Sequence, residues 1–119
     1  MILTRKYTFQ AARKLTKIAP EHICANLHGH TFHVTIKIEG KLNPENDFVL
    51  DFFDIDKIFN NFIFNKIDHQ YLNNLKGLGS PTTENIAIWI WNKLINPLNQ
   101  LIEVSVFEND LYGCTYKGD

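Results

Sequence analysis

The hydrophobic period of this chain changes along its length, and this change limits the folds open to it. Across Thr31–Glu39, apolar residues alternate with polar ones and share one face. The apolar members are Phe32, Val34, Ile36 and Ile38. Between Asp54 and about Ile67, apolar residues recur at spacings of three and four instead. A period of two predicts a strand with one buried face, and a period near 3.6 predicts an amphipathic helix.

The remaining segments give an order of elements. Strands are predicted over Ile2–Phe9, Thr31–Glu39, Leu101–Phe107 and Tyr112–Lys117, and helices over Asp54 to about Ile67 and Ser80 to about Asn96. The second helix starts with a capping hydroxyl, an early proline and an acid favoured by the helix dipole, and Pro97 ends it. Ala11–Asn26 is expected to be a long loop. The order ββααββ predicts an α+β fold, with helices on one face of an antiparallel sheet.

Length and charge exclude several classes of function. The chain has 119 residues, which predicts one domain over residues 1–119. Lys plus Arg is 12 and Asp plus Glu is 13, and this balance argues against nucleic-acid binding by phosphate neutralisation. Apolar stretches such as Ile86–Trp91 are far shorter than the ~20 residues of a membrane span, so no membrane partner is predicted. The N-terminus lacks the apolar block of an export signal, so we expect a cytoplasmic protein with Cys24 and Cys114 as free thiols.

Two histidines stand two residues apart where the second strand begins. In an extended segment, the side chains of His28 and His30 point to the same face. Two imidazoles on one face can occupy two corners of a tetrahedral zinc site. Two ordinary surface or hydrogen-bonding histidines would show the same spacing, so spacing alone leaves both interpretations open.

Further candidates for chemistry follow the first predicted helix, precede the second predicted strand and follow the third. Asp68 precedes His69, and a carboxylate beside an imidazole can orient it for acid–base work. The alternative is a helix end where Asp68 is solvated and His69 interacts with the dipole. Cys24 is either a small apolar residue or a proton-transferring thiol, and Glu108 is either a rim carboxylate or a ligand anchor.

Taken together, these segments resemble the 6-pyruvoyl-tetrahydropterin synthase family. The resemblance spans nearly the whole chain in family order. The matching segments are Phe9–Ala12, Cys24–Phe32, Val49–Phe52, Ile67–Asn73, Pro81–Asn85, Glu108 and Gly113–Asp119. The glycine–cysteine–aromatic tail and the compact length make the chain most similar to the 6-carboxy-5,6,7,8-tetrahydropterin synthase branch.

The resemblance implies a fold, an assembly and a reaction. The fold would be the T-fold (tunnelling fold), with a four-stranded antiparallel sheet and two helices on one face. Subunits of this fold form barrels, typically a homohexamer of two trimers with active sites between subunits. The reaction would convert 7,8-dihydroneopterin triphosphate to 6-carboxy-5,6,7,8-tetrahydropterin, acetaldehyde and triphosphate, in the synthesis of queuosine and other 7-deazaguanine precursors.

The resemblance also implies roles for single residues. His28 and His30 would ligate zinc, and Cys24, Asp68 and His69 would move protons. Zinc held by neutral imidazoles can polarise substrate hydroxyls and acidify the adjacent C–H.

The pterin ring would be held by a separate set of residues. Glu108 would anchor the amino and ring N–H groups, because a carboxylate matches this donor edge with two hydrogen bonds. Thr82 and Thr83 would border the pocket.

One position departs from the family pattern. The family takes its first zinc ligand from Phe-x-Ala-Ala-His, and here that position is Arg13. A guanidinium has no free lone pair for a metal. His22, Cys24, His33 or a neighbouring subunit could complete the site, water could fill the gap, or the site could be metal-free. The metal-free case would leave a pterin-binding protein or an impaired enzyme. The pyruvoyl synthase activity is a further alternative.

Overall fold

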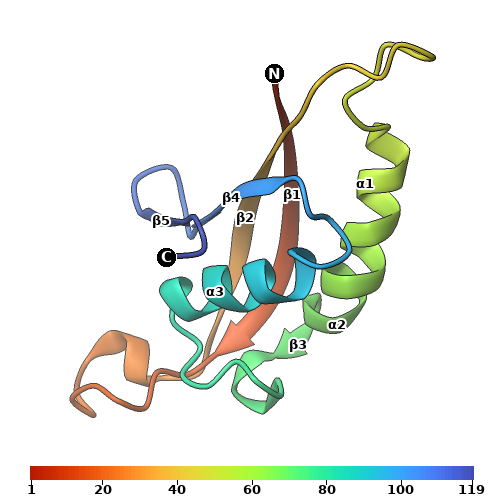
Figure 1. The fold of residues 1–119 in the computed structure, drawn as a ribbon. Coiled ribbons are helices and arrows are strands. Elements are labelled where there is room, and N and C mark those ends of the chain that lie inside the picture. Colours follow the sequence, from red (N-terminus) through yellow and green to blue (C-terminus); the bar gives the residue numbers. More distant parts are fainter.

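In the computed structural model, which describes residues 1–119, a long antiparallel hairpin forms the centre of the fold (Figure 1). Strand β1 (Ile2–Arg13) pairs with β2 (His28–Glu39) along its whole length. Strand β4 (Leu101–Phe107) adds antiparallel to β2, and β5 (Gly113–Tyr116) adds antiparallel to β4. On the other side of β1 lies β3 (Gln70–Tyr71), which runs parallel to it, so the strand order is β3-β1-β2-β4-β5.

The predicted four-stranded antiparallel sheet is therefore wrong in strand number and in direction. The sheet has five strands and is mixed, and β3 lies between the helices in the chain order. Strand β3 has only two residues, which is too short for an alternating pattern to mark it. The α+β class holds, with helices on one face of the sheet (Figure 1).

The central strands also extend further than predicted. Strand β1 continues past Phe9 to Arg13, and β2 already starts at His28. The buried–exposed alternation in fact continues through Ala11 to Arg13. A charged residue at an inward position conceals it in the sequence. The predicted loop is correspondingly shorter, and it contains a 3-10 helix over Ile23–Ala25.

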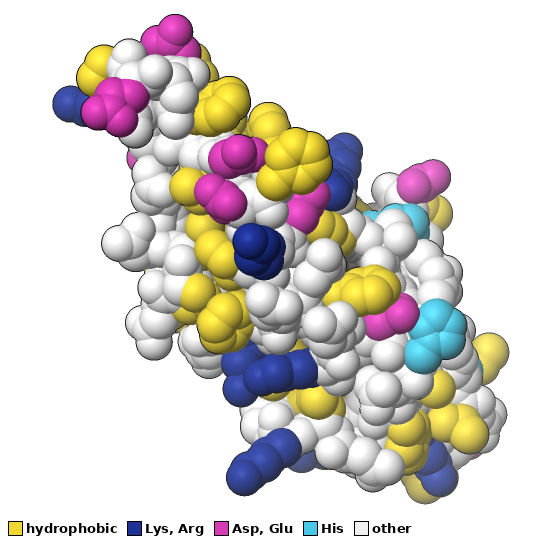
Figure 2. All heavy atoms as spheres, turned by 90° about the vertical axis from the view of Figure 1, so that its right-hand side faces the viewer, with side chains coloured by type: hydrophobic (Ala, Val, Ile, Leu, Met, Phe, Trp, Pro, Cys, Tyr) yellow, Lys and Arg dark blue, Asp and Glu magenta, His cyan; other side chains and the backbone are white.

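Two helical runs cover one face of the sheet. The first joins α1 (Phe52–Phe59), a π-helical segment (Asn60–Phe64) and α2 (Asn65–Ile67). A short 3-10 helix (Leu72–Asn74) follows β3, and the second run is α3 (Thr83–Leu94). None of these helices combines the length and the apolar character that crossing a bilayer requires. Figure 2 shows the side on which α1 lies, where acidic and apolar side chains are mixed at the surface.

The two faces of the sheet differ in composition. On the covered face, Phe9, Ala11 and Arg13 of β1 and the alternate residues of β2 from Phe32 to Ile38 are buried in the core. The open face carries exposed polar side chains such as Lys6, Thr8 and Gln10. We keep the names covered face and open face below, because candidate functional residues lie on both.

Candidate functional site

The end of β1 places a buried arginine on the covered face. Arg13 is only 2% exposed. Its Nη1 donates to the carbonyl oxygen of Pro81 at 3.0 Å and to Oγ1 of Thr83 at 3.4 Å, and its Nη2 forms an ion pair with Glu108. The guanidinium lies 5.1 Å from the centroid of the Phe32 ring. A buried cation needs such partners because desolvation is costly. The Arg13 side chain is thus held inside the protein by these contacts and does not extend into solvent.

Glu108 is the acidic partner of this buried arginine. It directly follows β4, and its Oε1 also accepts a hydrogen bond from Thr83 at 2.8 Å. Burial would raise the pKa of Glu108, but hydrogen bonds from Arg13 and Thr83 and the guanidinium charge outweigh it and hold the pKa below its usual value. Oε2 makes no hydrogen bond within the chain and remains free for a ligand.

A pocket of about 370 Å³ opens at this carboxylate. Its lining residues are Thr83, Glu84, Glu108, Tyr112, Gly113 and Cys114. Thr82 caps α3 by accepting a hydrogen bond from the Asn85 N–H at 3.1 Å, which fixes the neighbouring Thr83 towards Glu108. An ionised carboxylate with one free oxygen at a pocket wall can bind a group with N–H donors.

The histidine pair lies beside Arg13. His28 is directly opposite Arg13 in the hairpin, and the rings of His28 and His30 are 4.8 Å apart at an interplanar angle of 87°. Nδ1 of His28 lies 2.6 Å from the carbonyl oxygen of Asn26, which fixes the proton on Nδ1. Nε2 of His28 then carries a lone pair, and it is buried without a hydrogen-bond partner. The pKa of His30 is lowered by burial, by the Arg13 cation and by His28, which favours the neutral ring.

The donor set does not complete a zinc site within one chain. No group of three or more His, Cys, Asp or Glu side chains is placed to hold a metal ion. Neither of two suggested substitutes joins the pair, because His22 accepts a hydrogen bond from the Cys24 N–H and His33 lies on the open face. Arg13 occupies the third position with a permanent cation that has no lone pair to offer. Zinc at His28 and His30 stays a prediction, and the residues present do not fit a three-ligand site.

A second cluster of functional candidates lies at the edge of the sheet. Oδ2 of Asp68 lies 2.7 Å from Nδ1 of His69, and Oδ1 of Asp68 accepts a hydrogen bond from the Gln10 N–H at 2.9 Å. Adjacent residues rarely bond in this way. Here the left-handed backbone of His69, with φ of 58°, turns the ring back onto its neighbour. Burial would raise the pKa of Asp68, but the hydrogen bonds from Gln10 and His69 outweigh it and lower the pKa. The Asp68 carboxylate is thus fixed by Gln10 and contacts the ring of His69, whose side chain is 76% exposed.

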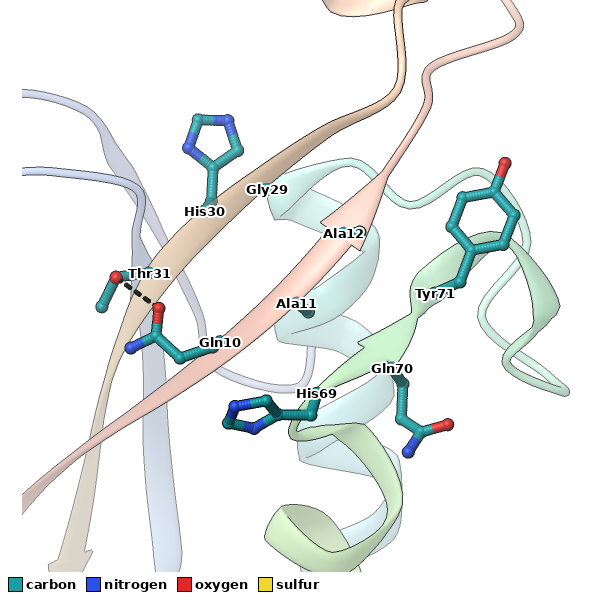
Figure 3. A pocket seen from close by; sticks show the side chains of 9 residues that line it. All are labelled: Gln10, Ala11, Ala12, Gly29, His30, Thr31, His69, Gln70 and Tyr71. Atoms are coloured by element: carbon teal, nitrogen blue, oxygen red, sulfur yellow. Dashed lines mark hydrogen bonds between the residues drawn. The ribbon is translucent and has the colours of Figure 1, made fainter.

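This cluster faces a pocket of about 470 Å³ on the open face (Figure 3). Its lining residues are Gln10, Ala11, Ala12, Gly29, His30, Thr31, His69, Gln70 and Tyr71. Oγ1 of Thr31 donates to Oε1 of Gln10 at 2.6 Å across the hairpin. In Figure 3, the His69 ring points towards Gln10, whereas the His30 ring points away from it. The predicted residues therefore fall into two groups, one on each face.

Cys24 joins neither group within the chain. It lies in the 3-10 helix before β2, and its backbone hydrogen bonds go to His22 and Leu15. Sequence reasoning missed the role of Gln10, because the predicted first strand ends at Phe9 and Gln10 pairs with Thr31 just beyond that end. It also missed the Pro81 carbonyl, for which the sequence holds no signal.

An α+β sheet with this topology defines a class of protein for which solved structures exist. The 6-pyruvoyl tetrahydropterin synthase of Caenorhabditis elegans superimposes with a TM-score of 0.90 at 26% identity, covering 100% of this chain and 96% of that chain. This chain thus shares the fold of that synthase, the T-fold, as the sequence resemblance predicts.

Sequence comparison identifies the family. The family model described as 6-pyruvoyl tetrahydropterin synthase matches residues 2–119, so the chain belongs to this family. A 6-carboxy-5,6,7,8-tetrahydropterin synthase of Synechocystis is 35% identical over 99 residues, which cover 78% of this chain and 74% of that protein. A 6-pyruvoyl tetrahydrobiopterin synthase of Dictyostelium discoideum is 30% identical over 132 residues, which cover 100% of this chain and 97% of that protein. Relatives of both branches are therefore similar to this chain.

Proposed function

We propose that this protein is a lyase that converts 7,8-dihydroneopterin triphosphate and water to 6-carboxy-5,6,7,8-tetrahydropterin, acetaldehyde and triphosphate. The observation that carries the proposal is the Asp68–His69 pair, which a left-handed backbone aims at an open pocket. Left-handed backbone is uncommon outside glycine, and such residues cluster at functional sites. The Synechocystis relative, named as a 6-carboxy-5,6,7,8-tetrahydropterin synthase, supports this branch. The product would feed queuosine and 7-deazaguanine precursor synthesis in the cytoplasm.

His69 would act as the proton-transferring group. Asp68 accepts from Nδ1 and so leaves Nε2 free to take a proton from the substrate side chain. Asp68 also stabilises the imidazolium that forms, as a carboxylate partner of a catalytic histidine does. Cys24 would return a proton from the other side of the reacting carbon, as the family resemblance implies.

Glu108 would anchor the pterin ring. Its free Oε2 can accept from the amino and ring N–H groups, while Arg13 and Thr83 hold Oε1. The lowered pKa of Glu108 keeps the carboxylate ionised at neutral pH. Thr82 contributes by holding the start of α3 in place.

The two groups need a second copy of the chain to form one site. His69 faces the open side of the sheet, and Glu108 lies beyond its covered face. A substrate held by Glu108 in one chain would meet His69 of a neighbour, in a homohexamer of two trimers. Large apolar side chains near both ends of the candidate site are exposed and available for such contacts. They are Ile23, Leu27, Leu111 and Tyr112.

The Arg13–Glu108 ion pair favours a second candidate function. A carboxylate already paired inside the chain is also consistent with a pterin-binding protein that does not catalyse. Incubating the protein with 7,8-dihydroneopterin triphosphate, with and without zinc, and measuring product masses separates the cases. Release of acetaldehyde supports the proposal, and a retained three-carbon side chain supports the pyruvoyl activity. Binding without turnover contradicts the proposed lyase.

A further inference from the structure

We propose that Arg13 and His28 form a metal-free binding site for a hydroxyl group of the ligand's side chain. The inference rests on the proposed function, which supplies the pterin as the ligand. It adds how this chain holds the side chain that the pterin ring carries. It starts from two polar atoms that are buried and have no hydrogen-bond partner, Nε of Arg13 and Nε2 of His28. Such atoms are rare in folded proteins because each costs free energy, so each needs an explanation.

The two atoms are complementary. Nε of Arg13 carries a hydrogen and can only donate, and Nε2 of His28 carries a lone pair because Nδ1 holds the proton towards Asn26. They belong to residues directly opposite each other in the hairpin, on the same face. A hydroxyl both accepts and donates. It can therefore take the Arg13 hydrogen on its oxygen and give its own hydrogen to His28.

The charge of the surroundings selects a neutral group. Arg13 carries a positive charge and would repel a metal cation placed at His28 and His30. Glu108 is ionised beside it and would repel an anion. A neutral hydroxyl avoids both repulsions.

The guanidinium is also fixed in place. Its other nitrogens are held by Glu108, Thr83 and Pro81, so little conformational freedom is lost when Nε binds a ligand. Arg13 thus supplies a fixed positive charge next to the side-chain oxygen, in a region where relatives with a histidine would place a metal.

The first test compares two pterins on the native chain after dialysis against EDTA. Calorimetry would measure binding of 7,8-dihydroneopterin, whose side chain carries hydroxyls, and of 6-methyl-7,8-dihydropterin, which has none. We expect dihydroneopterin to bind about tenfold more tightly, the value of one to two well-formed hydrogen bonds. His28→Leu should abolish the preference, and His33→Leu on the open face should keep it. Equal affinities of the two pterins for the EDTA-dialysed native chain would overturn the proposal.

The second test uses metal content, which does not depend on activity. Arg13→His would place a third neutral nitrogen opposite His28, and zinc should then bind at least roughly 100-fold more tightly than to the native chain. Lys14→His adds the same imidazole one residue along, at an exposed position, and should leave zinc affinity unchanged. Stoichiometric zinc in the native chain after dialysis would contradict a metal-free site.

The outcomes also separate this inference from the proposed function. Turnover that requires stoichiometric zinc on the native chain would keep the lyase and remove the hydroxyl site. Metal-free binding with the expected preference but no turnover would keep the hydroxyl site and remove the lyase.

Discussion

The covered face and the open face hold their polar groups in opposite ways. On the covered face, Arg13 is 2% exposed and its charged partner Glu108 has a side chain that is 26% exposed. On the open face, Asp68 is held by the backbone of Gln10, but the His69 side chain is 76% exposed. The charges of the first cluster are paired within one chain, whereas the second presents an imidazole to its surroundings.

This difference indicates how stability and chemistry are divided. A buried ion pair is costly to break, because either partner left alone is an uncompensated charge. An exposed imidazole contributes little to stability and is free to transfer protons. Changes to the exposed His69 should therefore lower activity at constant stability, and changes to the Arg13–Glu108 pair on the covered face should lower both.

The largest expected effect is on catalysis from the open face. His69→Asn should lower kcat about 10²- to 10⁴-fold, since a general acid–base group typically contributes that much. Asparagine is chosen because it tolerates the left-handed backbone at this position. The melting temperature should stay within error of the native value, and His33→Asn on the same face should change neither quantity. A large loss of stability in His69→Asn would break the comparison.

The covered face should give the largest effect on stability. Glu108→Leu leaves the buried Arg13 without its charge partner and should lower the free energy of unfolding by about 3 kcal/mol, measured by urea denaturation. Glu84→Leu changes an exposed acid on α3 in the same way and should cost only a few tenths of a kcal/mol. Arg13→Met combined with Glu108→Leu should recover most of the loss. If the double variant is no better than the single one, the ion pair is not the cause.

A smaller loss is expected from the carboxylate on the open face. Asp68→Ala removes the acceptor of the Gln10 N–H and should lower the free energy of unfolding by about 1–2 kcal/mol. The measurement is again urea denaturation, here combined with hydrogen exchange of the Gln10 amide. An unchanged exchange rate at this amide would show that Asp68 does not fix β1 to the turn.

The smallest effect should appear at acid pH. The pKa values of Glu108 and Asp68 are lower in the folded chain than their usual values of 4.5 and 3.8. The contribution of the two carboxylates to the free energy of unfolding is therefore complete at pH values above their usual pKa. It is lost as the pH falls through their lowered pKa values in the folded chain. The urea midpoint should fall as the pH is lowered from 6 to 3. In Arg13→Met, the share of this fall that is due to Glu108 should become smaller. A midpoint that stays constant down to pH 3 would contradict both assignments.

Local patterns predicted most of the fold. The alternation in β2, the three-and-four spacing of the first helical run and the capped start of α3 each report a periodic environment, and each element is present. Strand β3 was out of reach because two residues carry no period. The end of β1 was missed because Arg13 places a charge where the alternation requires an apolar residue.

The site was less predictable than the fold because it depends on contacts between distant residues. Arg13 and Glu108 are 95 positions apart, so neither shows its partner locally. The Asp68–His69 contact depends on a single backbone angle that no pattern encodes. What the sequence does provide is the residue types and the family order, which indicate the chemistry without its division between two faces.

Mixed oligomers test the central claim, that one active site combines the covered face of one chain with the open face of another. Glu108→Gln keeps an acceptor for Arg13 and should disable the proposed pterin anchor, and His69→Asn should disable the proposed proton transfer. Each variant alone should be inactive on 7,8-dihydroneopterin triphosphate. Co-expressed with different tags and purified through both, the mixed assembly should regain a measurable fraction of native turnover. A doubly purified assembly as inactive as its parents would contradict the divided site.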